Sequence, residues 1–151
     1  MSGSVEHMSL NEVKREVSSD QSRLSSFGSD VTYVSIVNST SEEFDEYTDE
    51  HMDGLTPPDD LFYQWLNEKK KLQKEEDSVT AHNTALDYVN YDERYRSYLK
   101  SGDGKEAIED VVDRVENGER VVLVCYCTDS KRCHREIAHE RVKDTLDKVR
   151  A

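Results

Sequence analysis

The sequence predicts an α/β fold: one domain with a mainly parallel sheet covered by helices on both faces. The run Val121–Cys127 is apolar on both sides of an extended chain, so helices must cover both faces of this strand. The strand belongs to a helix–turn–strand–loop–helix unit that begins near Lys105. The length of 151 residues fits a single domain.

The other elements follow from local signals along the chain. The β-branched run Val31–Val37 predicts the first strand, and capping-box spacing predicts a helix that starts near Ser41. Pro57-Pro58 precedes a predicted helix over Asp59–Glu75. The segment Ala81–Val89 fits either a helix or a strand with a turn.

A tyrosine-rich stretch follows. Its tyrosines are spaced three, four and three residues apart, which predicts one helix face. We interpret this face as part of the core, and the alternative is a platform that stacks nucleic-acid bases. The four residues are Tyr88, Tyr91, Tyr95 and Tyr98.

Residues 1–28 are polar and rich in serine. Such a segment cannot bury enough apolar surface to offset the entropy lost on ordering. The sequence therefore predicts a flexible N-terminal segment, dispensable for folding, and an α/β domain over residues 29–151.

The loop after the apolar strand is the candidate site. In open α/β sheets ligands bind beyond the carboxyl ends of strands, and here the loop also leads into a helix N-terminus that favours anions. Lys131, Arg132 and Arg135 place three cations within five residues of a chain whose net charge is −13. These three are the candidate anion-binding residues, with Arg135 as an exposed anchor. The alternative is that they only balance an acidic neighbourhood.

All three cysteines lie in this stretch. Cys133 stands at a helix N-terminus beside cations, which should lower its pKa, so Cys127, Cys133 and His134 are the candidate catalytic residues. Cys125 is expected to fill the core, and His139 to be exposed. The six-residue spacing Cys127–Arg132 also resembles, weakly, the loop of rhodaneses and cysteine phosphatases. A zinc site is the alternative that the thiols and His134 leave open, although Cys-x-Cys on a strand is a poor chelate.

The stretch VVLVCYCTDSKRCHREIAHERV resembles the C-terminal signature of domain-of-unknown-function family 488. In that family an apolar strand, a short loop and Cys-His-Arg at a helix start also end the domain. The tyrosine-rich helix near Tyr91–Leu99 and the helix Lys105–Glu116 stand upstream in the expected order, so the resemblance covers roughly the last 65 residues. It implies a Rossmann-like three-layer fold. The family's usual early strand ending in Asp-x-Arg is not visible here.

Composition limits the partners and the compartment. Thirty-three acidic against twenty basic residues exclude a protein that coats nucleic acid by bulk charge. The acidity resembles that of haloarchaeal proteins, and the alternative is an acidic mesophile. We expect no membrane association and, because three clustered cysteines make no secreted disulfide framework, a cytoplasmic protein.

Together these patterns predict that the protein binds an anionic small molecule or a nucleotide at the loop after Val121–Cys127, with thiol chemistry as an option. The alternatives are a non-enzymatic binding or interaction module and a Cys/His zinc-binding domain. We expect no cofactor and no resident metal. The sequence does not decide between an enzyme and a binding protein, and it gives no oligomeric state.

Overall fold

The structure is a computed structural model that describes residues 3–19, 31–38, 42–126 and 133–150. Its centre is a four-stranded sheet in the order β1-β4-β2-β3, in which every pairing is parallel. The strands are β1 (Ser4–Ser9), β2 (Val31–Ser35), β3 (Glu50–His51) and β4 (Arg120–Cys125). The predicted α/β fold with a parallel sheet is confirmed.

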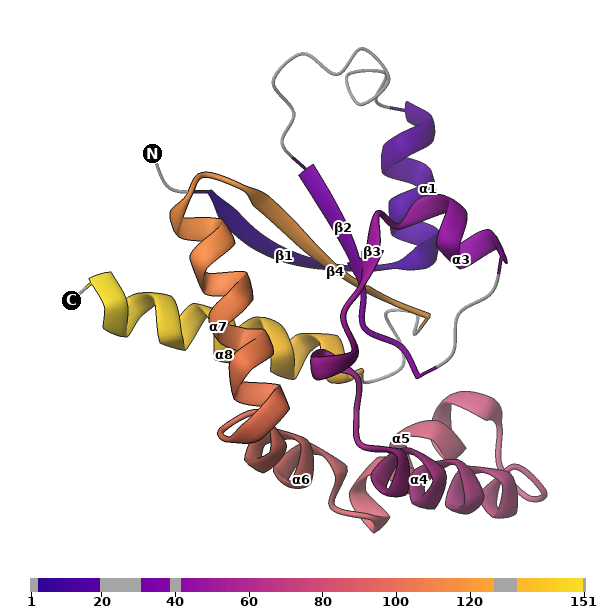
Figure 1. The fold of residues 1–151 in the computed structure, drawn as a ribbon. Helices are drawn as coiled ribbons and strands as arrows, with labels where there is room; N and C mark the ends of the chain where they lie inside the picture. Colours follow the sequence, from indigo (N-terminus) through magenta and orange to yellow (C-terminus); the bar gives the residue numbers. More distant parts are fainter. Residues whose placement is uncertain (1–2, 20–30, 39–41, 127–132, 151) are drawn as a thin grey trace.

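Helices cover both faces of the sheet (Figure 1). One face packs against α7 (Gly102–Glu116) and α8 (His134–Arg150), and the other against α1 (Leu10–Ser19) and α3 (Glu42–Tyr47). A helical group beside the sheet is formed by α4 (Asp59–Leu72), α5 (Ser78–Tyr88) and α6 (Tyr91–Tyr98), and the short 3₁₀ helix η1 (Asp53–Leu55) precedes it. This is the three-layer arrangement of a Rossmann-like domain.

Strand β4 lies inside the sheet, between β1 and β2, as its two-sided apolar pattern predicts. All five residues from Val121 to Cys125 are 0% exposed. Val121 and Leu123 belong to the core on the α7–α8 face, and Val122 and Val124 to the core on the α1–α3 face. The alternation of side chains along a strand therefore supplies both cores from one short segment.

The expectation of a flexible segment over residues 1–28 is wrong for residues 4–19, which form β1 and α1. Strand β1 pairs with β4 along its whole length, from Ser4 opposite Arg120 to Ser9 opposite Cys125. The guanidinium of Arg120 also binds Glu6 of β1 and Glu16 of α1, and its hydrogen bond to Glu6 lowers the pKa of that carboxyl. Backbone pairing and charge thus hold a strand that has little apolar surface.

The structure decides one prediction that the sequence left open and changes another. Ala81–Val89 lies in and just after α5, where the Asp77 carboxylate accepts a hydrogen bond from the Thr80 amide at 2.8 Å and so caps the helix. Asn90, with a φ of 56°, separates α5 from α6, so the four tyrosines do not share one helix. Tyr91 and Tyr95 are buried as expected, whereas Tyr88 is 72% exposed.

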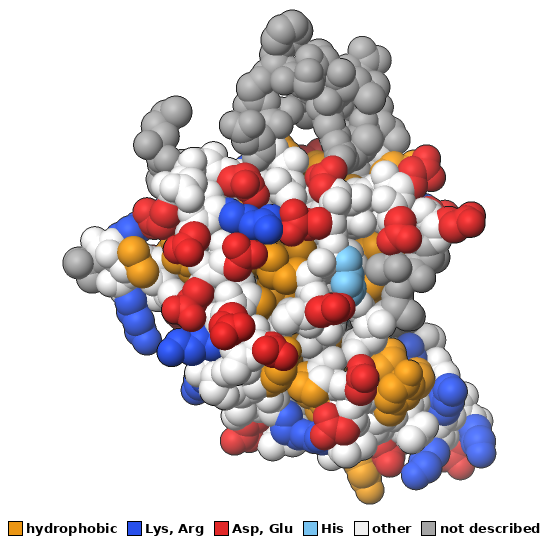
Figure 2. All heavy atoms as spheres, viewed as in Figure 1, with side chains coloured by type: hydrophobic (Ala, Val, Ile, Leu, Met, Phe, Trp, Pro, Cys, Tyr) orange, Lys and Arg blue, Asp and Glu red, His pale blue; other side chains and the backbone are white. Residues whose placement is uncertain are grey.

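The surface in Figure 2 carries scattered acidic side chains over most of the face shown. Basic side chains lie among them and gather mainly toward its margins. Within the described ranges, none of the helices combines the length and the apolar character needed to cross a membrane.

We predict that the N-terminal strand contributes to stability. Val5 is 6% exposed in the core between β1 and α8, so Val5→Ala should cost about 2 kcal/mol of unfolding free energy and lower the Tm by about 4–8 °C. The matched control is Ser4→Ala in the same strand, because Ser4 is exposed. Equal Tm values for the two variants in thermal denaturation would show that β1 is not docked.

Candidate functional site

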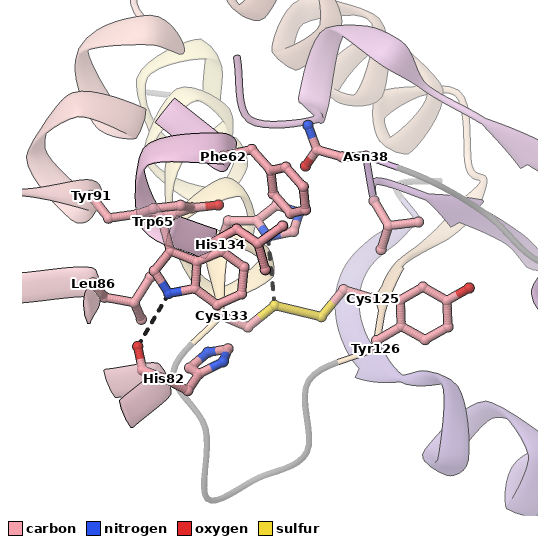
Figure 3. Close-up of a pocket in the computed structure, with 12 residues that line it drawn as sticks. Asn38, Phe62, Trp65, His82, Leu86, Tyr91, Cys125, Tyr126, Cys133 and His134 are labelled. Carbon is pink, nitrogen blue, oxygen red and sulfur yellow. Dashed lines mark hydrogen bonds between the residues drawn. A yellow bond between two sulfur atoms is a disulfide. The ribbon is translucent and has the colours of Figure 1, made fainter. Parts of the chain in front are cut away.

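A cavity of about 250 Å³ opens at the carboxyl ends of β2 and β4 (Figure 3). Strand β4 ends at Cys125 and Tyr126, and α8 begins beyond Cys133 with His134, so all four residues reach the cavity from the expected strand–loop–helix unit. The opposite wall comes from α4, α5 and α6. It is lined by Phe62, Trp65, Leu66, His82, Leu86 and Tyr91.

Aromatic side chains dominate this wall. Trp65 donates a hydrogen bond from Nε1 to the His82 carbonyl at 3.2 Å, and its ring meets the His82 ring edge-to-face at 4.9 Å. Phe62 packs on the other side of Trp65, with ring centroids 5.7 Å apart. These contacts fix the orientation of the aromatic rings, and the wall they form suits a flat, apolar group.

The sulfur atoms of Cys125 and Cys133 are in contact and are drawn as a disulfide in Figure 3. Cys125 is 0% exposed and Cys133 is 6% exposed. Cys125 fills the core, as predicted, but it also pairs with a second thiol. Their Cα atoms are 7.7 Å apart, wider than the roughly 4.4–6.8 Å of most disulfides, so the arrangement accommodates a dithiol as well.

His134 is buried and forms a hydrogen bond to the backbone just after β2. Its Nε2 donates to the Ile36 carbonyl, which leaves Nδ1 as the acceptor nitrogen, 3.6 Å from the Cys133 sulfur. Burial lowers the pKa of His134 to about 4; the Ile36 carbonyl opposes this shift, and Arg135 adds to it. The imidazole is therefore neutral near pH 7, and in the reduced protein it can accept a hydrogen bond from the Cys133 thiol.

Arg135 is not the exposed anchor that the sequence predicts. The residue is only 2% exposed, and its side chain extends toward the sheet rather than to solvent. The guanidinium donates from Nε to His7 Nδ1 at 3.2 Å and from Nη1 to the Cys125 sulfur at 2.9 Å. Arg135 sits on a face of α8 that packs on β1, a strand that the sequence analysis did not foresee.

The prediction of an exposed His139 is wrong for the same reason. His139 is half-buried against β1, where its Nε2 donates to the Val5 carbonyl at 3.0 Å and its ring contacts that of His7. Burial is the main cause that lowers the pKa of both histidines.

Three predicted site residues lie outside the described residues: Cys127, Lys131 and Arg132. The anion-binding loop therefore remains a prediction from the sequence. Within the described part of the chain, no group of three or more His, Cys, Asp or Glu side chains is placed to hold a metal ion.

A serine–histidine–aspartate chain, which the sequence analysis missed, lies at the ends of β2 and β3. Ser35 Oγ is 3.0 Å from His51 Nδ1, and His51 Nε2 is 2.8 Å from Asp53 Oδ1. Ser35 is 0% exposed while the Asp53 side chain is 94% exposed, so a substrate could not reach the hydroxyl. We interpret this chain as a tie between the two strands, not as a hydrolase triad.

The fold and the cavity define the class: a parallel α/β protein with a thiol-lined cavity beyond the carboxyl end of its inner strand. A family model described as DUF488-N3a, the active DUF488-N3 subclade, matches residues 15–146. The chain belongs to this family of domains of unknown function, as its C-terminal stretch indicates. No curated protein and no solved structure matches the chain.

We predict that His134 stays neutral until strongly acidic pH. Its folded pKa of about 4 lies below the ordinary value of 6.5, so this histidine contributes stability that is complete above pH 6.5 and is lost as pH falls through about 4. Imidazole NMR should give a titration midpoint near 4 and the Nε2–H tautomer, with His134→Asn identifying the resonance. A midpoint near 6.5 would mean that the ring is solvated and does not hold β2 to α8.

Proposed function

We propose that the protein binds a small molecule that combines a planar ring with an anionic group, and that Cys133 acts on this molecule as a nucleophile. A nucleoside monophosphate is one molecule of this kind. The observation that carries the proposal is the position of the Cys133 sulfur, in a cavity with an aromatic wall and 3.6 Å from the neutral imidazole of His134.

The size and lining of the cavity support the proposal that the bound molecule contains a planar ring. About 250 Å³ is below the usual range of roughly 300–1,000 Å³ for drug-sized ligands, so it suits one ring system rather than a dinucleotide. Phe62, Trp65 and Tyr91 offer apolar ring surfaces. Stacking on aromatic side chains is worth about 1–3 kcal/mol per base and does not depend on which base is bound.

The anionic group is supported by the start of α8 and by sequence. Helix N-termini favour negative charge, and α8 has 17 residues. Lys131 and Arg132 directly precede Cys133 in the chain and are the proposed counter-charges. Arg135 is better placed to act on the thiols, because its guanidinium is buried against Cys125.

The proposed chemistry is attack by the Cys133 thiolate on an electrophilic atom of the bound molecule. The same helix N-terminus stabilises the thiolate. His134 resists protonation, so we assign it the role of a positioning residue that orients the thiol through Nδ1 and anchors the turn through Ile36. Cys127 would be a further thiol on the same loop.

We predict that AMP binds in the cavity and changes the fluorescence of Trp65, the only tryptophan of the chain. Phe62→Ala should weaken AMP binding about tenfold, the equivalent of about 1.4 kcal/mol, because it removes a ring surface from the wall. The matched control is Tyr63→Ala, the neighbouring aromatic residue of α4, which is 58% exposed and does not line the cavity. The affinity of Tyr63→Ala for AMP should stay within about twofold of the wild-type value.

Two truncated probes separate the parts of the proposal. Adenosine lacks the phosphate, and ribose phosphate lacks the planar adenine ring. Each should therefore bind more weakly than AMP at matched ionic strength. If adenosine binds as well as AMP, the anionic part is wrong. If ribose phosphate binds as well as AMP, or Phe62→Ala and Tyr63→Ala behave alike, the aromatic cavity is not the site. Failure of every probe to bind would favour a non-enzymatic interaction module.

A further inference from the structure

We propose that Cys125 and Cys133 form a redox-active dithiol that exchanges with small disulfides carrying aromatic and anionic groups. The inference rests on the proposed function, because it uses the same cavity and the same nucleophile. Beyond the proposed function, the inference assigns a role to a second thiol, that of Cys125. It also names the class of reaction, which is thiol–disulfide exchange.

The two cysteines differ in the way that such exchange requires. Both cysteines line the cavity, but Cys133 lies at the start of α8 and is 6% exposed, whereas Cys125 ends the buried strand β4 and is 0% exposed. A disulfide substrate in the cavity would meet Cys133 first. The Cys125 sulfur is in contact with the Cys133 sulfur, so it can attack a mixed disulfide that forms on Cys133.

The surroundings of Cys125 favour its reaction. Arg135 donates a hydrogen bond from Nη1 to the Cys125 sulfur at 2.9 Å, and the residue is 2% exposed. A buried cation next to a neutral thiol gains little, but next to a thiolate it gains a charge-assisted interaction in a medium of low dielectric constant. Cations beside a cysteine favour the thiolate, which is the reactive form. The competing interpretation is that both cysteines only fill the core as small apolar residues.

The exchange proceeds in two balanced steps. The Cys133 thiolate attacks one sulfur of the substrate disulfide, forms a mixed disulfide and expels the first substrate thiolate. The Cys125 thiolate then attacks the Cys133 sulfur, forms the Cys125–Cys133 disulfide and expels the second thiolate. The protein pair gives up two electrons and the substrate disulfide gains them. An external dithiol must then reduce the protein disulfide for the next cycle.

The test treats the fully reduced full-length chain with dithiobis(nitrobenzoate), an anionic aromatic disulfide. Mass spectrometry then locates every label and every new disulfide, and cleavage after Tyr126 separates Cys125 from Cys127. We expect a Cys125–Cys133 disulfide that carries no label. Cys125→Ser should instead keep a stable nitrothiobenzoate on Cys133, because the proposed resolving thiol has been removed. The neutral aliphatic hydroxyethyl disulfide should oxidise the wild-type pair at least tenfold more slowly.

A label that stays on Cys133 of the wild type, or a Cys127–Cys133 disulfide, would overturn the inference. In either case labelling at Cys133 and AMP binding can persist, so the proposed function would survive the loss of the dithiol. A Cys133 that carries no label and forms no disulfide, together with absent AMP binding, would remove both. If Cys125→Ser does not fold, mapping of the wild-type disulfide in glutathione redox buffers decides: a Cys125–Cys133 bond supports the inference, and its absence overturns it.

Discussion

The burial of β4 on both faces is the constraint on which the rest of the structure depends. Its side chains supply two cores at once, and its backbone pairs with β1 on one edge and β2 on the other. A strand held in this way cannot shift in register without moving its apolar residues to the wrong core. Its carboxyl end is therefore fixed, and with it the position of Cys125 opposite the start of α8.

This rigidity explains why an apolar cavity can exist in such an acidic protein. The surface carries most of the charge, while the cavity takes its walls from β4, α8 and the group of α4, α5 and α6. Arg135 is a cation that the fold buries, and His134 is kept neutral by burial. The reactive groups thus lie where water is scarce, and electrostatic effects between them are stronger than at the surface.

The parts of the fold that the sequence predicted are those specified by local pattern. Val121–Cys125 could be assigned to an inner strand, and the start of α8 at Cys133-His134 could be located, because the signals lie within a few residues. Strand β1 could not be found in this way, since the sequence Ser4–Ser9 is mostly polar and is held by backbone pairing and by Arg120, more than a hundred residues away.

In the candidate site, too, the sequence indicates the features set by neighbouring residues and not those set by distant contacts. Its thiols and His134 were visible as a cluster in the sequence, but the aromatic wall comes from helices that lie far from them in the chain. The exposure of Arg135 and His139 was misjudged because it depends on β1, which covers that face of α8. Burial depends on contacts between distant segments of the chain. The sequence periodicity of α8 does not indicate these contacts.

The most direct test of the account is the reactivity of Cys133 in the native protein. Reduced protein is treated with iodoacetamide and with its N-phenyl derivative, and the rate of modification at each cysteine is followed by peptide mass spectrometry, with the unfolded chain as reference. The account predicts that native Cys133 reacts faster with the phenyl reagent than with iodoacetamide, that unfolding abolishes this preference, and that AMP slows the reaction. A native Cys133 that shows no preference and no protection would contradict the claim that the cavity presents a nucleophile to a bound ring.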